Sequence, residues 1–216
     1  MDPFAVCLAL GPVAIYLIVL GAMNLFRRPF PVSGSRDLAA LGLAVSGLVL
    51  VGPMELFFPV SASAAFGAMV WGFLAALYVL ALVLCCLVLR PRLVIYNISA
   101  DELRPVLADL AVELDPEARW AGDSLVLPRL GVQLYLESAP AMRNVSLVSA
   151  GPQQAPQGWV QLQAALADAL SRLEVSRNPR GVALLGTGLI LASLLSVAVS
   201  RAPQTVAHSL LEMFRR

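Results

Sequence analysis

The amino-acid sequence predicts an α-helical membrane protein with four transmembrane helices and a small α+β domain inserted between the third helix and the fourth. Three observations predict this fold class. Hydrophobic residues make up 59% of the chain and charged residues 13%, against about 45–50% and about 25% in soluble domains. Four apolar runs approach the length of a membrane span. The stretch between the last two runs alternates between strand-like and helix-like patterns.

The apolar runs divide the chain into four parts. The first run, Phe4–Phe26, holds no charged residue and is long enough to cross a hydrocarbon core of about 30 Å at about 1.5 Å per residue. We expect transmembrane helices at about 4–26, 38–58, 64–89 and 181–200. The membrane region then covers 1–90, the soluble domain 91–176, the fourth helix 177–200, and an amphipathic interfacial tail 201–216.

The second run is the weakest of the four. Its clean apolar stretch runs only from Leu38 to Val51, and it spans a membrane only if Gly52–Phe58 is included. That stretch contains Glu55, beside a Gly-Pro pair that loosens a helix. We expect the carboxylate of Glu55 to lie about one turn from the outer surface, where it reaches water; the alternative is a buried functional acid. Whether this run crosses decides which side of the membrane holds the soluble domain.

Within 91–176 the pattern predicts the order β-α-β-β-β-β-α. Residues 132–138 alternate apolar and polar side chains, which indicates a strand with one buried face. Two amphipathic helices carry their apolar residues on one side. We therefore expect a mostly antiparallel sheet with both helices on one face. The strands are expected at 93–98, 119–121, 124–128, 132–138 and 145–150.

The first of these helices has an unusual start. Ser99 and Glu102 have the spacing of a capping box, in which each side chain accepts a hydrogen bond from the other residue's backbone amide. Pro105 follows past the first turn and removes an amide donor. We therefore expect the helix to start later than the capping box implies.

Arginines predict the orientation in the membrane, because short cytoplasmic loops are rich in positive charge. All fifteen basic residues are arginine. With four spans, the inner side holds seven of the ten arginines that lie outside the body of the soluble domain and the outer side three. If the second run fails to cross, the soluble domain faces outward. The inner seven are also candidate contacts for anionic lipid head groups: Arg27, Arg28, Arg36, Arg90, Arg92, Arg177 and Arg180.

Small residues recur every four positions in two of the spans. This spacing lets helix backbones approach closely, within one chain or between two copies of it. The candidate packing residues are Ala68, Gly72, Ala76, Gly188, Ala192 and Ser196.

Several chemistries are excluded or unsupported. The stretch 91–176 contains no histidine and no cysteine, which removes Ser-His-Asp and Cys-His catalysis and the ordinary zinc-ligand spacings there. Glu113, Asp115 and Glu117 cluster at a helix end but lack the glycine turn of a calcium loop. We therefore expect no cofactor and no metal. We also expect no nucleic-acid partner, since the net charge is only +1.

We expect a non-enzymatic anchoring, assembly or sensing subunit of the bacterial inner membrane, whose cytoplasmic α+β domain binds a partner protein. A second hypothesis is a transport or proton-coupled subunit that uses Glu55; unchanged ion flux in a Glu55→Gln variant would exclude it. A third is an enzyme acting on a lipid phosphate held by the arginines; lipid binding unaffected by replacing Arg90 and Arg92 would count against it.

Overall fold

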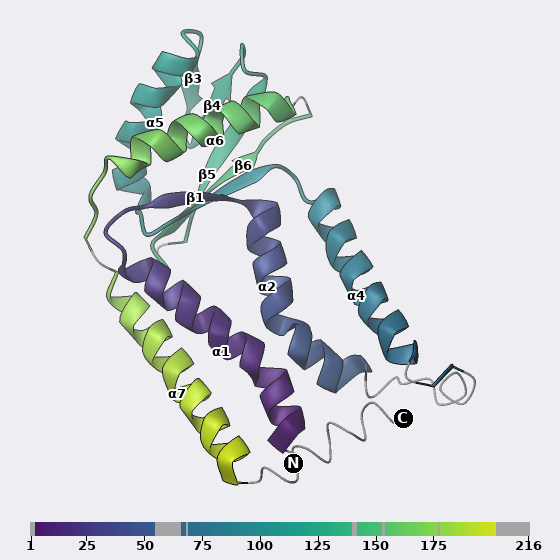
Figure 1. Cartoon of the computed structure of the whole chain (residues 1–216). Coiled ribbons are helices and arrows are strands. Elements are labelled where there is room, and N and C mark those ends of the chain that lie inside the picture. The colour runs from purple at the N-terminus through teal and green to yellow at the C-terminus, as the bar shows by residue number, and fades with distance from the viewer. Residues whose placement is uncertain are drawn as a thin grey trace. The chain divides into compact units, whose positions relative to one another are not determined.

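The structure is a computed structural model that describes residues 3–54, 66–67, 69–139, 142–152, 154–176 and 178–201 (Figure 1). The chain divides into two compact units. The helical unit comprises residues 1–21, 38–87 and 183–216, and the sheet unit comprises 22–37 and 88–182.

The described part of the chain contains four apolar helices that are long enough to cross a membrane. The second of them is α2, which continues without a break into a π-helical turn, η1, so that it runs over 21 residues from Gly34 to Met54. The predicted second span therefore has the length it needs within the described residues. The bounds are α1 Pro3–Leu25, α2 Gly34–Val49, η1 Leu50–Met54, α4 Met69–Val88 and α7 Pro179–Arg201.

The π-helical turn falls on the Gly52-Pro53 pair. Proline has no amide to donate to the preceding turn, and a wider turn is one way in which a helix accommodates the missing hydrogen bond. The helix thus changes its winding where the sequence predicted that it loosens.

Glycines mark the closest approaches within the helical unit. A methyl group at Gly47 would collide with the Leu8 carbonyl oxygen, so α1 and α2 meet backbone to backbone there. At Gly188 a methyl group would lie 2.9 Å from the Ile18 amide nitrogen and 3.1 Å from the Ala14 oxygen. Both contacts involve α1, which therefore packs closely against α2 and α7.

The sheet unit contains a six-stranded sheet in which all neighbouring strands are antiparallel, in the order β1-β2-β6-β5-β4-β3. Two helices, α5 (Ala100–Leu114) and α6 (Pro156–Ser171), accompany it. The strands are β1 Phe30–Ser33, β2 Arg92–Tyr96, β3 Arg119–Ala121, β4 Ser124–Leu127, β5 Val132–Ala139 and β6 Asn144–Ser149.

The order of elements predicted for 91–176 is present, but the sheet also has a strand that the sequence analysis did not predict. This strand, β1, lies between α1 and α2 in the chain and pairs with β2. Its four residues include Pro31, which cannot donate a hydrogen bond. Proline is tolerated at the edge of a sheet, and β1 is an edge strand.

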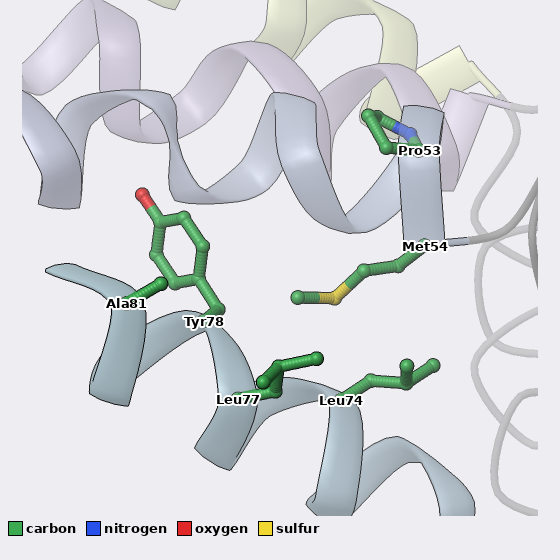
Figure 2. Close-up of a pocket in the computed structure, with 6 residues that line it drawn as sticks. All are labelled: Pro53, Met54, Leu74, Leu77, Tyr78 and Ala81. Atoms are coloured by element: carbon green, nitrogen blue, oxygen red, sulfur yellow. The ribbon is translucent and has the colours of Figure 1, made fainter.

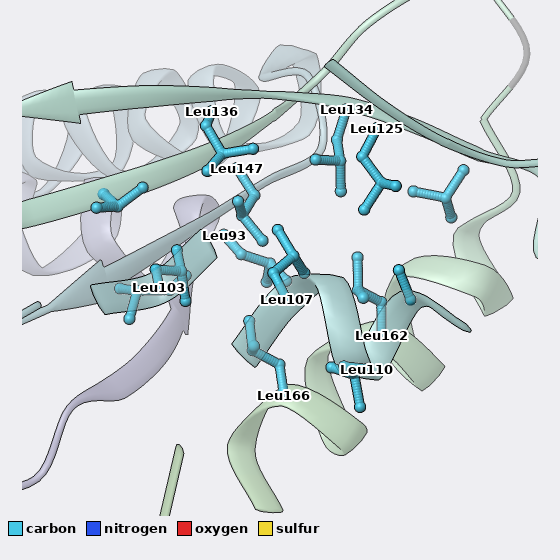
Figure 3. Packing of buried hydrophobic residues seen from close by; sticks show 14 of the residues in the cluster. Leu93, Leu103, Leu107, Leu110, Leu125, Leu134, Leu136, Leu147, Leu162 and Leu166 are labelled. Atoms are coloured by element: carbon cyan, nitrogen blue, oxygen red, sulfur yellow. The ribbon is translucent and has the colours of Figure 1, made fainter. Parts of the chain in front are cut away.

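One hydrophobic core holds the sheet unit together (Figure 3). Alternate residues of β2, β4, β5 and β6 point to the same side as the apolar faces of α5 and α6. Both helices therefore cover one face of the sheet, as predicted. The fully buried side chains at its centre include Ile95, Leu103, Leu107, Leu125, Leu134, Leu147, Leu162 and Leu166.

The start of α5 follows the capping box, and the expectation of a later start is wrong. The Glu102 amide donates to the Ser99 hydroxyl at 3.3 Å, and the Ser99 amide donates to the Glu102 carboxylate at 2.9 Å. Pro105 lies inside the helix and is exposed. Because it faces solvent, water can bond the carbonyl group that its missing amide leaves.

The glycine contacts generate a test with a matched control. We expect Gly47→Ala and Gly188→Ala each to lower the free energy of unfolding by about 1–3 kcal/mol, because the added methyl group overlaps the backbone of α1. Gly72 has nothing within 4 Å of an added methyl group, so Gly72→Ala is expected to be neutral or to stabilise by up to about 1 kcal/mol through helix propensity. Denaturant unfolding of the chain in mild detergent measures this; equal losses for Gly47→Ala and Gly72→Ala would contradict it.

Candidate functional site at the helix ends

Three deeply buried asparagines gather in the sheet unit close to the ends of the long helices. The whole chain has four asparagines, at positions 24, 97, 144 and 178. Asn24, Asn97 and Asn178 are 1%, 0% and 2% exposed. Hydrogen bonds link the segments that carry all four, and we call this group the asparagine junction.

Asn178 is the central member of the junction. Its Nδ2 donates to Asn24 Oδ1 at 3.2 Å and to the Met142 carbonyl at 3.1 Å. Its Oδ1 accepts from the Arg180 amide at 3.1 Å, which caps the start of α7. One side chain therefore joins the end of α1, the β5–β6 connection and the start of α7. Asn144 reaches the same Met142 carbonyl at 3.1 Å when its amide is oriented so that Nδ2 donates.

Asn97 connects the end of β2 to the chain that leaves α1. Its backbone has φ 62°, a left-handed conformation that asparagine adopts more readily than most residues. Its Nδ2 donates to the Phe26 carbonyl oxygen. The next residue, Ile98, donates its amide to the Arg143 carbonyl at 2.8 Å.

Arg143 extends the junction to α5 and to the segment before α7. Its guanidinium donates to the Glu102 carboxylate at 2.9 and 3.1 Å and to the Ser176 hydroxyl at 2.8 Å. Burial alone would raise the pKa of Glu102. Hydrogen bonds from Ser99 and the charge of Arg143 favour the ionised carboxylate more strongly, so the pKa of Glu102 lies below its ordinary value of 4.5.

A second group of contacts ties the first turn of α2 to β2. The Tyr96 hydroxyl donates to Asp37, and Arg92 pairs with the same carboxylate at 3.5 Å. The Phe30 and Tyr96 rings stack across the β1–β2 pair with centroids 5.6 Å apart. The ends of all four long helices thus belong to the sheet unit, because residues 22–37, 88 and 179–182 are part of it.

The chemistry of this site is that of a structural clamp. It consists of amides, carbonyl groups and two ion pairs that hold distant segments together. Among the described residues, no three histidine, cysteine, aspartate or glutamate side chains gather as a metal site. At the acidic helix end, Asp115 is fully buried. Its carboxylate accepts hydrogen bonds from the backbone amides of Glu117 at 2.9 Å and Arg129 at 2.7 Å. That carboxylate therefore holds two turns together.

The predicted arginines separate into different environments. Arg27, Arg28, Arg36 and Arg90 are exposed. Arg92 pairs with Asp37. The backbone amide of Arg180 donates to the cap of α7, and Arg177 lies outside the described residues.

The predicted small residues also differ. Gly188 lies against α1, whereas Gly72 and Ala76 are exposed. Ala192 is half-buried, and the exposed Ser196 donates its hydroxyl to the Ala192 carbonyl at 2.9 Å. Ala68 lies outside the described residues.

Glu55 also lies outside the described residues. The π-helical turn that ends just before it lines an open groove with α4 (Figure 2). The residues lining this groove are uncharged: Pro53, Met54, Leu74, Leu77, Tyr78 and Ala81. The hydroxyl of Tyr78 donates to the Gly42 carbonyl at 2.6 Å and joins α4 to α2. The groove is therefore a mostly apolar surface, and none of these lining residues is acidic or basic.

The asparagine junction was missed by the sequence analysis, although two local signals were present. Asn178 precedes Pro179 at the start of an apolar run, which is the pattern of a helix cap followed by proline. Asn24 is a polar amide near the end of an apolar run. Neither signal names the partner, because the residues that bond are up to 154 positions apart.

No protein family, curated protein or solved structure matches this chain. Its function is therefore argued from its own residues.

The lowered pKa of Glu102 predicts a pH dependence of stability. A carboxylate with a depressed pKa in the folded state contributes stability that is fully present above the unfolded value of 4.5 and is lost as the pH falls through the folded value. We expect Glu102→Gln to be less stable than the wild type at neutral pH, and the difference to shrink in acid. Unfolding of the full chain between neutral and acidic pH measures it. Glu113→Gln, at an exposed carboxylate of the same helix, is the matched control; a pH-independent difference for Glu102→Gln would refute the assignment.

Proposed function

We propose that the chain is a non-enzymatic subunit of the bacterial inner membrane, in which four helices anchor a sheet domain that binds a partner protein in the cytoplasm. The role is anchoring, assembly or sensing within a membrane complex. Four features support it: the length of the helices, the pairing of β1 with β2, the arginines at the helix ends, and the exposed part of the second sheet face around Tyr135.

The β1–β2 pairing supports four crossings. In the chain, α2 and α4 both lie between β1 and β2. Paired strands lie on the same side of a membrane, so α2 and α4 either both cross or neither crosses. The helix α4 is 20 residues long, contains no charged residue and is almost unburied within the chain, which favours crossing. An arrangement in which only α2 fails to cross would separate two hydrogen-bonded strands.

The arginines support a cytoplasmic sheet domain. With four crossings, the side that holds the sheet unit carries Arg177 and the six described arginines at the helix ends, and the other side carries Arg201, Arg215 and Arg216. Positive charge in short loops favours the cytoplasmic side.

The observation that carries the proposed partner binding is the second face of the sheet. Residues that pair across neighbouring strands share a face, and this face includes Val126, Tyr135 and Val148. None of them belongs to the core beneath α5 and α6. Tyr135 is 38% exposed. We define the open face as Arg119, Ala121, Ser124, Val126, Gln133, Tyr135, Glu137, Ser146 and Val148.

The composition of the open face suits a protein partner. Aromatic and arginine side chains are enriched at interfaces, and apolar centres with polar surroundings are typical of them. Here Tyr135 lies opposite Val148 on one side and Ser124 on the other, with Glu137 two positions along the same strand. The strands are rigid, so a partner would meet these side chains without ordering a loop.

Site-specific photo-crosslinking in cells tests this proposal. A photoreactive amino acid at Tyr135 is expected to give an adduct of discrete mass with one partner protein. The same amino acid at Val160, which is 67% exposed on α6, is the matched control and is expected to give no such adduct. The same adduct at both positions, or none at Tyr135, would contradict binding through the open face.

A further inference from the structure

The arginines of the sheet unit differ in whether a carboxylate neutralises them. Five arginines lie between Leu93 and Ser176, and four of them form ion pairs with nearby acids. The pairs are Arg104–Asp123, Arg129–Glu117, Arg143–Glu102 and Arg172–Asp168. The body of the sheet unit therefore satisfies most of its positive charge internally.

The arginines at the helix ends are different. Arg27 and Arg28 follow α1, Arg36 lies in the first turn of α2, and Arg90 follows α4. All four are exposed, and no carboxylate among the described residues forms an ion pair with them. Asp37, the acid nearest in the sequence to Arg27, Arg28 and Arg36, already binds Arg92 and Tyr96.

Hydrogen bonds fix the backbone near these arginines, although no described carboxylate forms an ion pair with their side chains. The Arg27 carbonyl accepts the Val175 amide at 2.8 Å, which fixes the end of α1 to the chain before α7. Arg36 precedes Asp37, the residue that ties α2 to β2. The first turn of a helix disfavours a positive charge, so the position of Arg36 requires a negative partner to be favourable.

We propose that Arg27, Arg28, Arg36 and Arg90 form an arginine collar that binds the phosphate head groups of anionic phospholipids. Charge complementarity supports this occupant, because guanidinium groups bind phosphate oxygens in a bidentate manner. Each of the four lies within three residues of the end of an apolar helix, at the depth where head groups lie. The inference rests on the membrane insertion of the proposed function.

The collar predicts binding that depends on lipid charge. The full chain in neutral detergent is expected to retain phosphatidylglycerol in native mass spectrometry and to gain thermal stability as this lipid is added. Phosphatidylcholine is expected to do neither. Added salt is expected to weaken the effect, because screening acts on exposed charges. Each collar arginine replaced by glutamine is expected to lower the affinity for phosphatidylglycerol by about fivefold.

Two further variants keep the test specific. Arg119→Gln removes an exposed arginine of the open face and is expected to leave lipid retention unchanged. Replacing all four collar arginines by lysine keeps the positive charge and is expected to retain most of the salt-dependent lipid binding. That result would assign the loss of binding in the glutamine variants to the lost charge and not to misfolding.

The outcomes separate the collar from the proposed function. Equal retention of both lipids by the wild type, or an equal loss in Arg119→Gln, overturns the collar while leaving membrane anchoring intact. Competition by free inorganic phosphate at low concentration also overturns it, since the site would then bind phosphate without a lipid. A chain that carbonate washing removes from native membranes would instead overturn the membrane function itself.

Discussion

The pairing of β1 with β2 is the constraint on which the rest of the structure depends. Four residues between two apolar helices, Phe30–Ser33, form the edge of a sheet whose other strands lie more than fifty positions later in the chain. This pairing fixes the start of α2 and the end of α4 to the same sheet. The asparagine junction does the same for the end of α1 and the start of α7. The chain thus passes between the helical unit and the sheet unit at four points.

The surfaces of the sheet unit differ in burial, exposure and ion pairing. One face of the sheet is covered by α5 and α6 and supplies the hydrophobic core. On the opposite face Tyr135 of β5 is exposed, whereas Val94 and Tyr96 of β2 are buried. Among the described residues, Arg27, Arg28, Arg36 and Arg90 at the helix ends form no ion pair with a carboxylate, whereas most arginines in the body of the unit are paired. A domain that faces a membrane at one end and a protein on one sheet face would use its charges and its apolar side chains in this way.

How much of this could be predicted from the sequence depends on the range of the interactions. The alternation along Val132–Ala139 and the capping box at Ser99 are local, and both appear in the structure. The strand β1 could not be predicted, because Phe-Pro-Val-Ser is short and contains proline, and only pairing with β2 makes it a strand. The same holds for Asn24 and Asn178, because their hydrogen bond joins two segments that lie 154 positions apart in the chain. For Pro105 the local rule gave the wrong expectation of a late helix start. The proline is exposed, so water can bond the carbonyl group that its missing amide leaves.

The central claim is that the first turn of α2 and the body of the sheet domain share one side of a membrane. The most direct measurement uses a membrane-impermeant thiol reagent on sealed vesicles of known orientation. Cys7, Cys85 and Cys86 are first replaced by alanine, and single cysteines are introduced at the exposed Ser35 and Ser171. We expect both cysteines to react from the cytoplasmic side, and a cysteine added after Arg216 to react from the opposite side. Labelling of Ser35→Cys and Ser171→Cys from opposite sides would contradict the β1–β2 pairing and the account built on it.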